Sequence, residues 1–132
     1  VLGEGKQRRQ LERKIAALGL QEDFVLLGTV ENPYPFYAQT DIYVHVTRFE
    51  GRSIAIQEAQ TLGCPVVVSD VSGNRIQVTH NEDGLLCSME PEAIAQSVET
   101  LLNDAAFRKR LGQASMAKRT PSQKSIINQL KF

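Results

Sequence analysis

The sequence predicts an α/β domain with a Rossmann-like parallel sheet and flanking helices. First, residues 41–70 read as a strand, a tight loop, a helix and a second strand. Second, residues 65–68 are followed and preceded by turn signals and are apolar at every position, which is typical of a strand buried on both faces of a parallel sheet. Parallel strands need a crossover connection, and a helix predicted at residues 54–62 supplies it.

The N-terminal part of the chain is predicted to contribute the end of one strand, one helix and a second strand. Residues 1–2 read as the end of a strand, and the helix that follows ends where Gly19 can serve as its C′ glycine. A second apolar run at residues 24–30 is predicted to be a strand. Residues 32–35 carry two prolines and favour extended or turn geometry, so residues 36–39 can form at most one helical turn.

The C-terminal half is predicted to add one short strand and three helices. Residues 70–74 are predicted to be a loop, and residues 84–87 a strand. Pro91 is expected to open a helix that runs to Leu102, and its inward-facing residues are predicted to be Ile94, Val98, Leu101 and Leu102. Asp104 is the predicted cap of the next helix. The last helix is expected at about residues 121–132.

Length and composition fit one domain over residues 1–132, with 42% hydrophobic residues and no net charge. Basic residues collect in residues 1–20 and 105–132, which are either solvated faces or possible contacts with an anionic membrane surface or an acidic partner. No nucleic-acid-binding motif, metal-ligand spacing or membrane-spanning stretch is present in the sequence. Cys64 and Cys87 read as buried thiols of a reducing compartment, so we expect a cytoplasmic protein that is either free or peripheral at the membrane.

One residue of the helix at 54–62 stands out. At about 100° per residue, Glu58 falls inside the apolar arc, between Ile54 and Leu62. A carboxylate in such a position loses solvation unless another group donates hydrogen bonds to it. The donor could belong to a neighbouring loop, or it could be a hydroxyl group of a bound ligand.

The loop before this helix favours the ligand. Glu50 follows the strand at residues 42–46, and Gly51 permits close approach of a ligand to the backbone. Ser53 is the predicted N-cap, with Ile54 as the first helical residue. Free N–H groups at a helix N-terminus favour anions such as phosphate, and ligands of open α/β sheets bind outside the carboxyl ends of the strands.

Glu50 and Glu58 have seven residues between them, and this pair resembles the E-x7-E motif of retaining GT-B glycosyltransferases, the glycosyl transferases group 1. The words DIYV, FEGRSIAIQEAQTLGCPVVVSD, GN and DGLLC are also similar to that family. The resemblance covers about residues 3–112. It corresponds to part of the C-terminal half of the GT-B fold, the nucleotide-sugar-binding domain.

The resemblance implies roles for individual residues. Glu58 would hold the ribose hydroxyls of the donor, and Glu50 would be the catalytic residue that contacts the donor sugar and stabilises charge near the reacting centre. Backbone N–H groups of four consecutive residues would bind the diphosphate or the sugar: Gly51, Arg52, Ser53 and Ile54. No metal and no cofactor is implied.

Two further donor contacts are predicted near the N-terminus. Gly5 belongs to a G-x-G turn, which is either a phosphate-binding turn or a plain strand-to-helix turn. Val30 stands beside the loop at which enzymes of the family usually bind the nucleobase of the donor.

The chain departs from the family pattern in several places. Ile76 stands where the family often has a glutamate, and Arg52 stands at a position that is often apolar. This chain has no match for the first βα unit of the family's domain, which carries the arginine and lysine that neutralise the donor diphosphate. It also has no match for the N-terminal acceptor-binding domain of the GT-B fold. We therefore expect a fragment truncated at its N-terminal side, with an open sheet edge that could pair two copies through residues 1–2.

The expected function is that of the donor-binding domain of a glycosyltransferase. The full enzyme would transfer a sugar from a nucleotide-sugar to a glycan or lipid-linked acceptor with retention, and the fragment alone would be inactive. One alternative is a nucleotide-sugar epimerase, which shares the fold. The other is a non-catalytic binding module of flavodoxin-like form.

Overall fold

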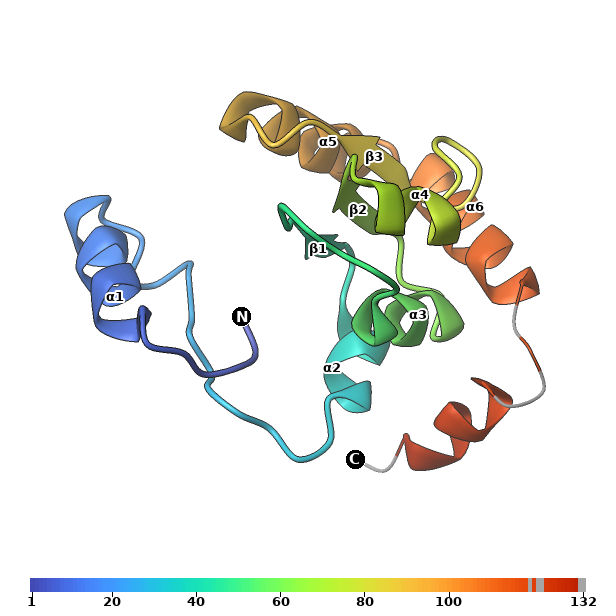
Figure 1. Ribbon diagram of the computed structural model, residues 1–132, viewed down its shortest axis with the longest axis horizontal. Coiled ribbons are helices and arrows are strands. Elements are labelled where there is room, and N and C mark those ends of the chain that lie inside the picture. The colour runs from blue at the N-terminus through green and yellow to red at the C-terminus, as the bar shows by residue number, and fades with distance from the viewer. Residues whose placement is uncertain (119, 121–122, 131–132) are drawn as a thin grey trace. The chain divides into compact units, whose positions relative to one another are not determined.

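The computed structural model describes residues 1–118, 120 and 123–130. Two compact units make up the chain, Val1–Pro33 and Tyr34–Phe132. Figure 1 traces them from blue at the N-terminus to red near the C-terminus. The prediction of one incomplete domain over residues 1–132 stays a prediction.

The first unit contains the predicted N-terminal helix, α1 (Arg8–Ala17), which ends before Gly19 at a φ of 67°. The strand predicted at residues 24–30 is wrong. This segment forms only isolated bridges, from Gly28 to Leu2 and to Gly3, and no continuous ladder. Gly28 has a φ of 75°, a left-handed conformation that bends an extended run out of strand geometry.

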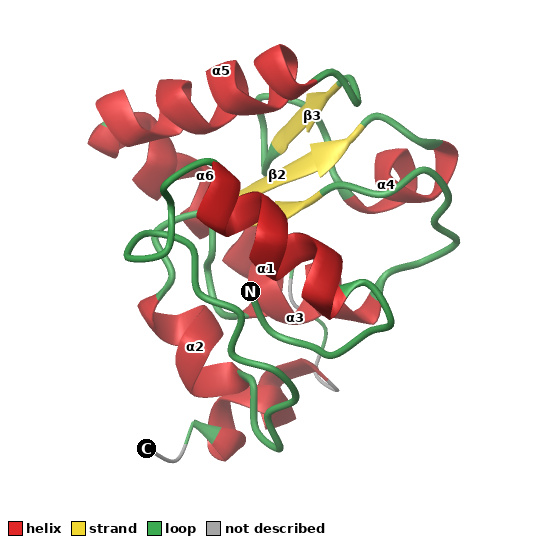
Figure 2. Ribbon diagram, turned by 90° about the vertical axis from the view of Figure 1, so that its left-hand side faces the viewer, coloured by secondary structure: helices red, strands yellow, loops and turns green. Residues whose placement is uncertain are grey.

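The second unit is built on the predicted parallel sheet. Its strands are β1 (Tyr43–His45), β2 (Val66–Ser69) and β3 (Leu85–Cys87), in the order β1-β2-β3. Both strand pairs are parallel, and Figure 2 shows the three yellow strands side by side. All four residues of β2 are buried, as the apolar run predicted.

The crossovers between these strands are helices. The predicted helix after β1 is α3 (Ile54–Thr61), and it ends before Gly63 at a φ of 80°. The prediction of a loop at residues 70–74 is wrong, because α4 (Ser72–Gln77) begins there and leads to β3. The residue before α4 is Val71, whose side chain makes no capping hydrogen bond, so the usual start signal of a helix is missing. Ahead of β1, α2 (Tyr34–Gln39) begins earlier than the predicted turn allowed.

Helices cover both faces of the sheet, which makes three layers. The face of Val66 and Val68 packs in one cluster with Ile56 of α3. The opposite face, that of Val67, packs with Leu101 of α5 (Pro91–Asn103) and with residues of α6 (Ala105–Ala117). Burying one valine or leucine side chain stabilises the fold by about 1.5–3 kcal/mol, so β2 is the main anchor of this unit.

Several details of the C-terminal half follow the sequence. The Asp104 carboxylate accepts a hydrogen bond from the Phe107 N–H at 2.8 Å and caps α6, as predicted. Cys64 and Cys87 are buried free thiols, also as predicted. Leu102, expected to face inward, is 58% exposed because the α5 stripe that packs on the sheet runs through Leu101. The last helix is the 3₁₀ helix η1 (Gln123–Gln129), and the remaining predicted residues, 121–122 and 131–132, lie outside the described part.

Candidate functional site

The candidate site lies at the carboxyl ends of β1 and β2, where ligands of open α/β sheets bind. Ser69, the last residue of β2, is fully buried. Its hydroxyl donates to the Thr47 carbonyl oxygen at 2.7 Å and accepts from the Thr47 N–H at 2.9 Å. The hydroxyl thereby fastens the start of the β1–α3 loop, residues 46–53, to the central strand.

Glu50 lies in this loop, and its carboxylate is held from β1. Its Oε2 is 3.0 Å from Nε2 of His45, and Nδ1 of the same ring is 3.1 Å from the hydroxyl of Tyr43. The side chains of His45 and Glu50 are 24% and 23% exposed. Glu50 is therefore an oriented but accessible carboxylate, as a group that contacts a bound sugar should be.

Glu58 also has a protein partner. Its Oε1 accepts a hydrogen bond from the hydroxyl of Tyr34, on α2, at 3.0 Å. Burial, and then this hydrogen bond, raise the pKa of Tyr34, so the phenol keeps its proton. The donor to Oε1 of Glu58 is therefore a neighbouring segment of the protein, which was one of the two alternatives left open by the sequence. Within the described residues no hydrogen bond reaches Oε2, which stays available to a second donor.

The prediction that an apolar arc surrounds Glu58 is wrong at Ile54. Ile54 is 71% exposed, whereas Ile56 is fully buried. Glu58 itself is partly buried.

The N-terminus of α3 is formed as predicted. The Ser53 hydroxyl accepts a hydrogen bond from the Ile56 N–H at 3.4 Å. The Ser53 N–H is taken, because it donates to Oε1 of Gln77 at 2.7 Å, and Nε2 of Gln77 donates to the Ser53 carbonyl at 2.9 Å. The N–H groups of Gly51, Arg52 and Ile54 donate to no other described residue. Three of the four predicted backbone donors therefore remain free for an anion.

The segment after β2 supports the Glu50 loop from the other side. Gly73 packs on the carbonyl groups of Glu50 and Gly51 so closely that a Cβ atom at this position would overlap them. The next residue, Asn74, is fully buried and donates from Nδ2 to the Ser69 carbonyl at 2.8 Å. Its Oδ1 is buried without a partner among the described residues. Ile76 is 77% exposed and makes no charged contact with the site.

Arg52 lines a cavity that includes neither Glu50 nor Glu58. It lines a small cavity of about 150 Å³ together with polar residues of α3, α4, α6 and η1. Its guanidinium forms no hydrogen bond or ion pair with any described residue. Its donor contact stays a prediction.

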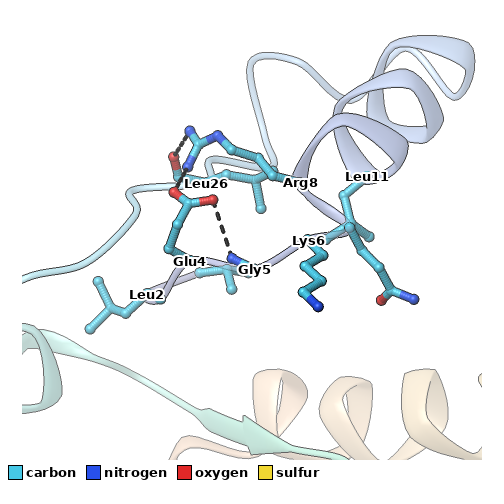
Figure 3. Close-up of a pocket in the computed structure, with 10 residues that line it drawn as sticks. Leu2, Glu4, Gly5, Lys6, Arg8, Leu11 and Leu26 are labelled. Carbon is cyan, nitrogen blue, oxygen red and sulfur yellow. Dashed lines mark hydrogen bonds and ion pairs between the residues drawn. The ribbon is translucent and has the colours of Figure 1, made fainter.

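Gly5 and Val30 belong to the first unit, and the structure does not relate them to the two glutamates. The N–H of Gly5 donates to Oε1 of Glu4 at 3.2 Å, and Oε2 of Glu4 pairs with Arg8 at 2.7 Å (Figure 3). This turn lines a cavity of about 550 Å³ that also includes Lys6. Val30 is not among the residues that line it. Both donor contacts stay predictions.

The sequence reasoning missed six side chains that hold the site: Tyr34, Tyr43, His45, Ser69, Asn74 and Gln77. Ser69 and Gln77 bond to residues more than 20 positions away, and no recognised motif links His45 to Glu50, so the sequence pattern does not indicate them. The G-N word at residues 73–74 was the one available signal. Across the part of the chain that is described, no cluster of metal-ligating side chains occurs. Nor does any helix described here have the length and apolar character needed to cross a bilayer.

Comparison with known proteins identifies the family of this chain. The family model described as glycosyl transferases group 1 matches residues 1–118. The chain belongs to this family. Of the three function classes that the sequence left open, membership favours the glycosyltransferase.

Curated glycosyltransferases are similar to this chain over most of its length. One is the N-acetylgalactosamine-N,N'-diacetylbacillosaminyl-diphospho-undecaprenol 4-alpha-N-acetylgalactosaminyltransferase of Campylobacter jejuni, 35% identical over 111 residues, which are 83% of this chain. Another is the capsular polysaccharide biosynthesis glycosyltransferase CapM of Staphylococcus aureus, 34% identical over 89 residues, or 67% of this chain. The match covers only 30% and 23% of these two relatives.

Solved structures share the fold. Anabaena HepE in complex with UDP superimposes with a TM-score of 0.83 at 21% identity, over 98% of this chain and 37% of HepE. WaaG, a glycosyltransferase involved in lipopolysaccharide biosynthesis, gives a TM-score of 0.82 at 19% identity, over 97% of this chain and 35% of WaaG. The predicted fold class, a partial GT-B domain, is thus confirmed.

Proposed function

We propose that this domain binds the nucleotide-sugar donor of a GT-B glycosyltransferase that works with retention of configuration. One observation carries the proposal: three free backbone N–H groups at the start of α3 are bracketed in sequence by two carboxylates, Glu50 and Glu58. Free N–H groups favour a diphosphate, and carboxylates accept hydrogen bonds from sugar and ribose hydroxyls.

Each group has a role that its contacts support. Glu58 accepts from Tyr34 through Oε1, which leaves Oε2 for a ribose hydroxyl. Glu50, held by His45, would contact the donor sugar and stabilise positive charge that develops at the reacting carbon. The N–H groups of Gly51, Arg52 and Ile54 would stabilise negative charge on the departing diphosphate.

The comparisons support the substrate class. HepE is known in complex with UDP, with UDP and glucose, and with UDP-glucose, so a uridine nucleotide is the first donor to test. The Campylobacter jejuni relative described above is named for transfer to an undecaprenol-linked acceptor. We therefore propose a lipid-linked or glycan acceptor, and with it a cytoplasmic enzyme that contacts a membrane surface peripherally.

We further propose that the chain by itself binds the donor weakly and transfers nothing. The resemblance implies two cations on the diphosphate that have no match here, and each charge-assisted contact contributes about 1.5–3 kcal/mol. Loss of both lowers affinity by roughly two to four decades. The acceptor-binding domain of the GT-B fold would also exclude water from the site.

The test uses a full-length protein that contains this domain. Calorimetric titration with UDP, GDP and ADP should give micromolar affinity for one of them. The anomeric configuration of the product, followed by NMR from a donor of known configuration, should be retained. Absence of binding to every nucleotide would overturn the donor site, and an inverted product would overturn the proposed stereochemistry.

A further inference from the structure

The contact between His45 and Glu50 joins a rigid element to an exposed loop. His45 is the last residue of β1 and pairs in register with Val68 of the buried central strand. Glu50 follows five residues later, next to Phe49, which is 90% exposed. The Glu50 side chain itself is 23% exposed, and among the described residues only His45 forms a hydrogen bond or ion pair with it. The 3.0 Å contact between Nε2 and Oε2 is therefore the main side-chain restraint on it.

The ring of His45 is itself held in one orientation. Nδ1 lies 3.1 Å from the hydroxyl of Tyr43, and the two rings are nearly parallel at 29° with centroids 6.0 Å apart. Tyr37 packs edge-on against Tyr43, with centroids 5.3 Å apart at 77°. Burial raises the pKa of both tyrosines, so the phenol groups keep their protons.

The hydrogen-bonding chemistry selects one arrangement of protons on the neutral ring. An ionised carboxylate only accepts hydrogen bonds, so Nε2 must carry the proton that faces Glu50. Nδ1 of the neutral ring is then an acceptor, and the phenol of Tyr43 is the donor beside it. In this arrangement the contact from Tyr43 to His45 and the contact from His45 to Oε2 of Glu50 each join a donor to an acceptor, as in other sites where a second group fixes a histidine tautomer.

We propose that His45 is a positioning residue, which holds the Glu50 carboxylate in the orientation that meets the donor sugar. This inference rests on the proposed role of Glu50. His45 acts through Glu50 and touches neither donor nor acceptor. Its removal should therefore lower the rate of transfer and leave donor binding nearly unchanged, because a displacement of about 1 Å at a reacting group can cost a factor of about 100.

The test is a double-mutant cycle in the full-length transferase. H45A is expected to lower kcat by about 10- to 100-fold and to change the donor KM by less than about threefold. The double variant H45A/E50Q should be no slower than E50Q alone. H45Q, whose side-chain amide offers an N–H near the position of Nε2, should recover part of the lost rate, whereas H45L should not.

The second histidine of the chain provides the matched control. Nδ1 of His80 accepts a hydrogen bond from the Leu86 N–H at 3.0 Å, away from the two glutamates in sequence, and H80Q should keep wild-type kcat. Thermal denaturation of every variant separates loss of fold from loss of rate. If H45A does not fold, the comparison of H45Q with H45L still decides.

The outcomes distinguish this inference from the proposed function. A wild-type rate for H45A beside an inactive E50Q overturns the role of His45 and leaves that of Glu50 intact. Multiplicative losses in the double variant also overturn it, because His45 would then act independently of Glu50. A wild-type rate for E50Q overturns the proposed role of Glu50 and this inference with it.

Discussion

Gly73 at the start of α4 packs directly on the carbonyl oxygen of Glu50, with no space between them for a side chain. The contact joins two segments that follow adjacent parallel strands. One is the loop with the candidate catalytic carboxylate, and the other is the crossover from β2. The backbone of the candidate site is therefore positioned by the packing of these two segments, as well as by its own hydrogen bonds.

We predict that Gly73→Ala destabilises the domain and displaces the Glu50 loop. A methyl group at this position overlaps backbone atoms, which cannot move aside as a flexible side chain could. Such overpacking costs typically about 1–3 kcal/mol. The free energy of unfolding, measured by urea denaturation, should fall by that amount, and transfer activity of the full-length enzyme should fall with it.

Gly51→Ala is the matched control for stability. A Cβ atom at Gly51 has no heavy atom within 4 Å, so its free energy of unfolding should stay near that of the wild type. Equal stability of the two variants would contradict the close packing of Gly73.

A second prediction concerns Asn74. Asn74→Ala removes a fully buried amide that donates to both the carbonyl and the hydroxyl of Ser69, and it leaves the Val71 N–H as the remaining donor to that carbonyl. We expect a loss of about 1–3 kcal/mol in the free energy of unfolding. Asn103→Ala, at the exposed end of α5, should change it by less than about 0.5 kcal/mol. Similar values for the two variants would show that the Asn74 network contributes little.

The sequence predicted the parts of the fold that local patterns determine. The apolar residues of β2 indicated burial on both faces, Ser53 indicated the start of α3, and Asp104 indicated the start of α6. In each case the signal lies within a few residues of the feature that it predicts.

The errors arose where a single residue or a distant contact decides the structure. Gly28 interrupts a run that otherwise has the composition of a strand, and α4 starts after Val71 without a capping side chain. The link between His45 and Glu50 joins side chains only five residues apart, and nothing in that spacing distinguishes it from two independent polar residues. The pairing of two copies through residues 1–2 stays a prediction.

A third prediction concerns the buried thiol of Cys64. Burial raises its pKa from an ordinary value of 9.0 to about 12. In the unfolded chain the thiol releases its proton above pH 9, while in the fold it keeps it. The stabilising contribution is therefore complete below pH 9 and is lost as the pH rises from 9 through 12, at up to about 1.4 kcal/mol per pH unit.

The measurement is urea denaturation between pH 7 and 11 for the wild type and for Cys64→Ala. Above pH 9 the free energy of unfolding should fall less steeply in the variant. Tyr37, Tyr43 and Tyr34 also have raised pKa values and add to the fall in both proteins at higher pH. Identical slopes for the two proteins between pH 9 and 10 would contradict the burial of the thiol.

The fourth prediction is that Glu58→Gln weakens nucleotide binding without loss of fold. The glutamine keeps an oxygen that can accept from the Tyr34 hydroxyl, so the contact with α2 survives. It loses the negative charge that strengthens a hydrogen bond from a ribose hydroxyl, a difference of about 1–3 kcal/mol. The affinity of the full-length enzyme for UDP, measured by calorimetry, should fall by about 5- to 150-fold.

Two further variants make the fourth prediction specific to the second carboxylate oxygen. Tyr34→Phe removes the donor to Oε1 and leaves the charge in place, so it should weaken UDP binding by less than Glu58→Gln does. Glu99→Gln, on the exposed side of α5, removes an equal charge from the surface and should leave the affinity unchanged. If Glu58→Gln binds UDP as tightly as Glu99→Gln, the ribose contact is wrong. If Tyr34→Phe binds UDP more weakly than Glu58→Gln does, nucleotide binding depends more on the fixed position of the Glu58 side chain than on its free oxygen.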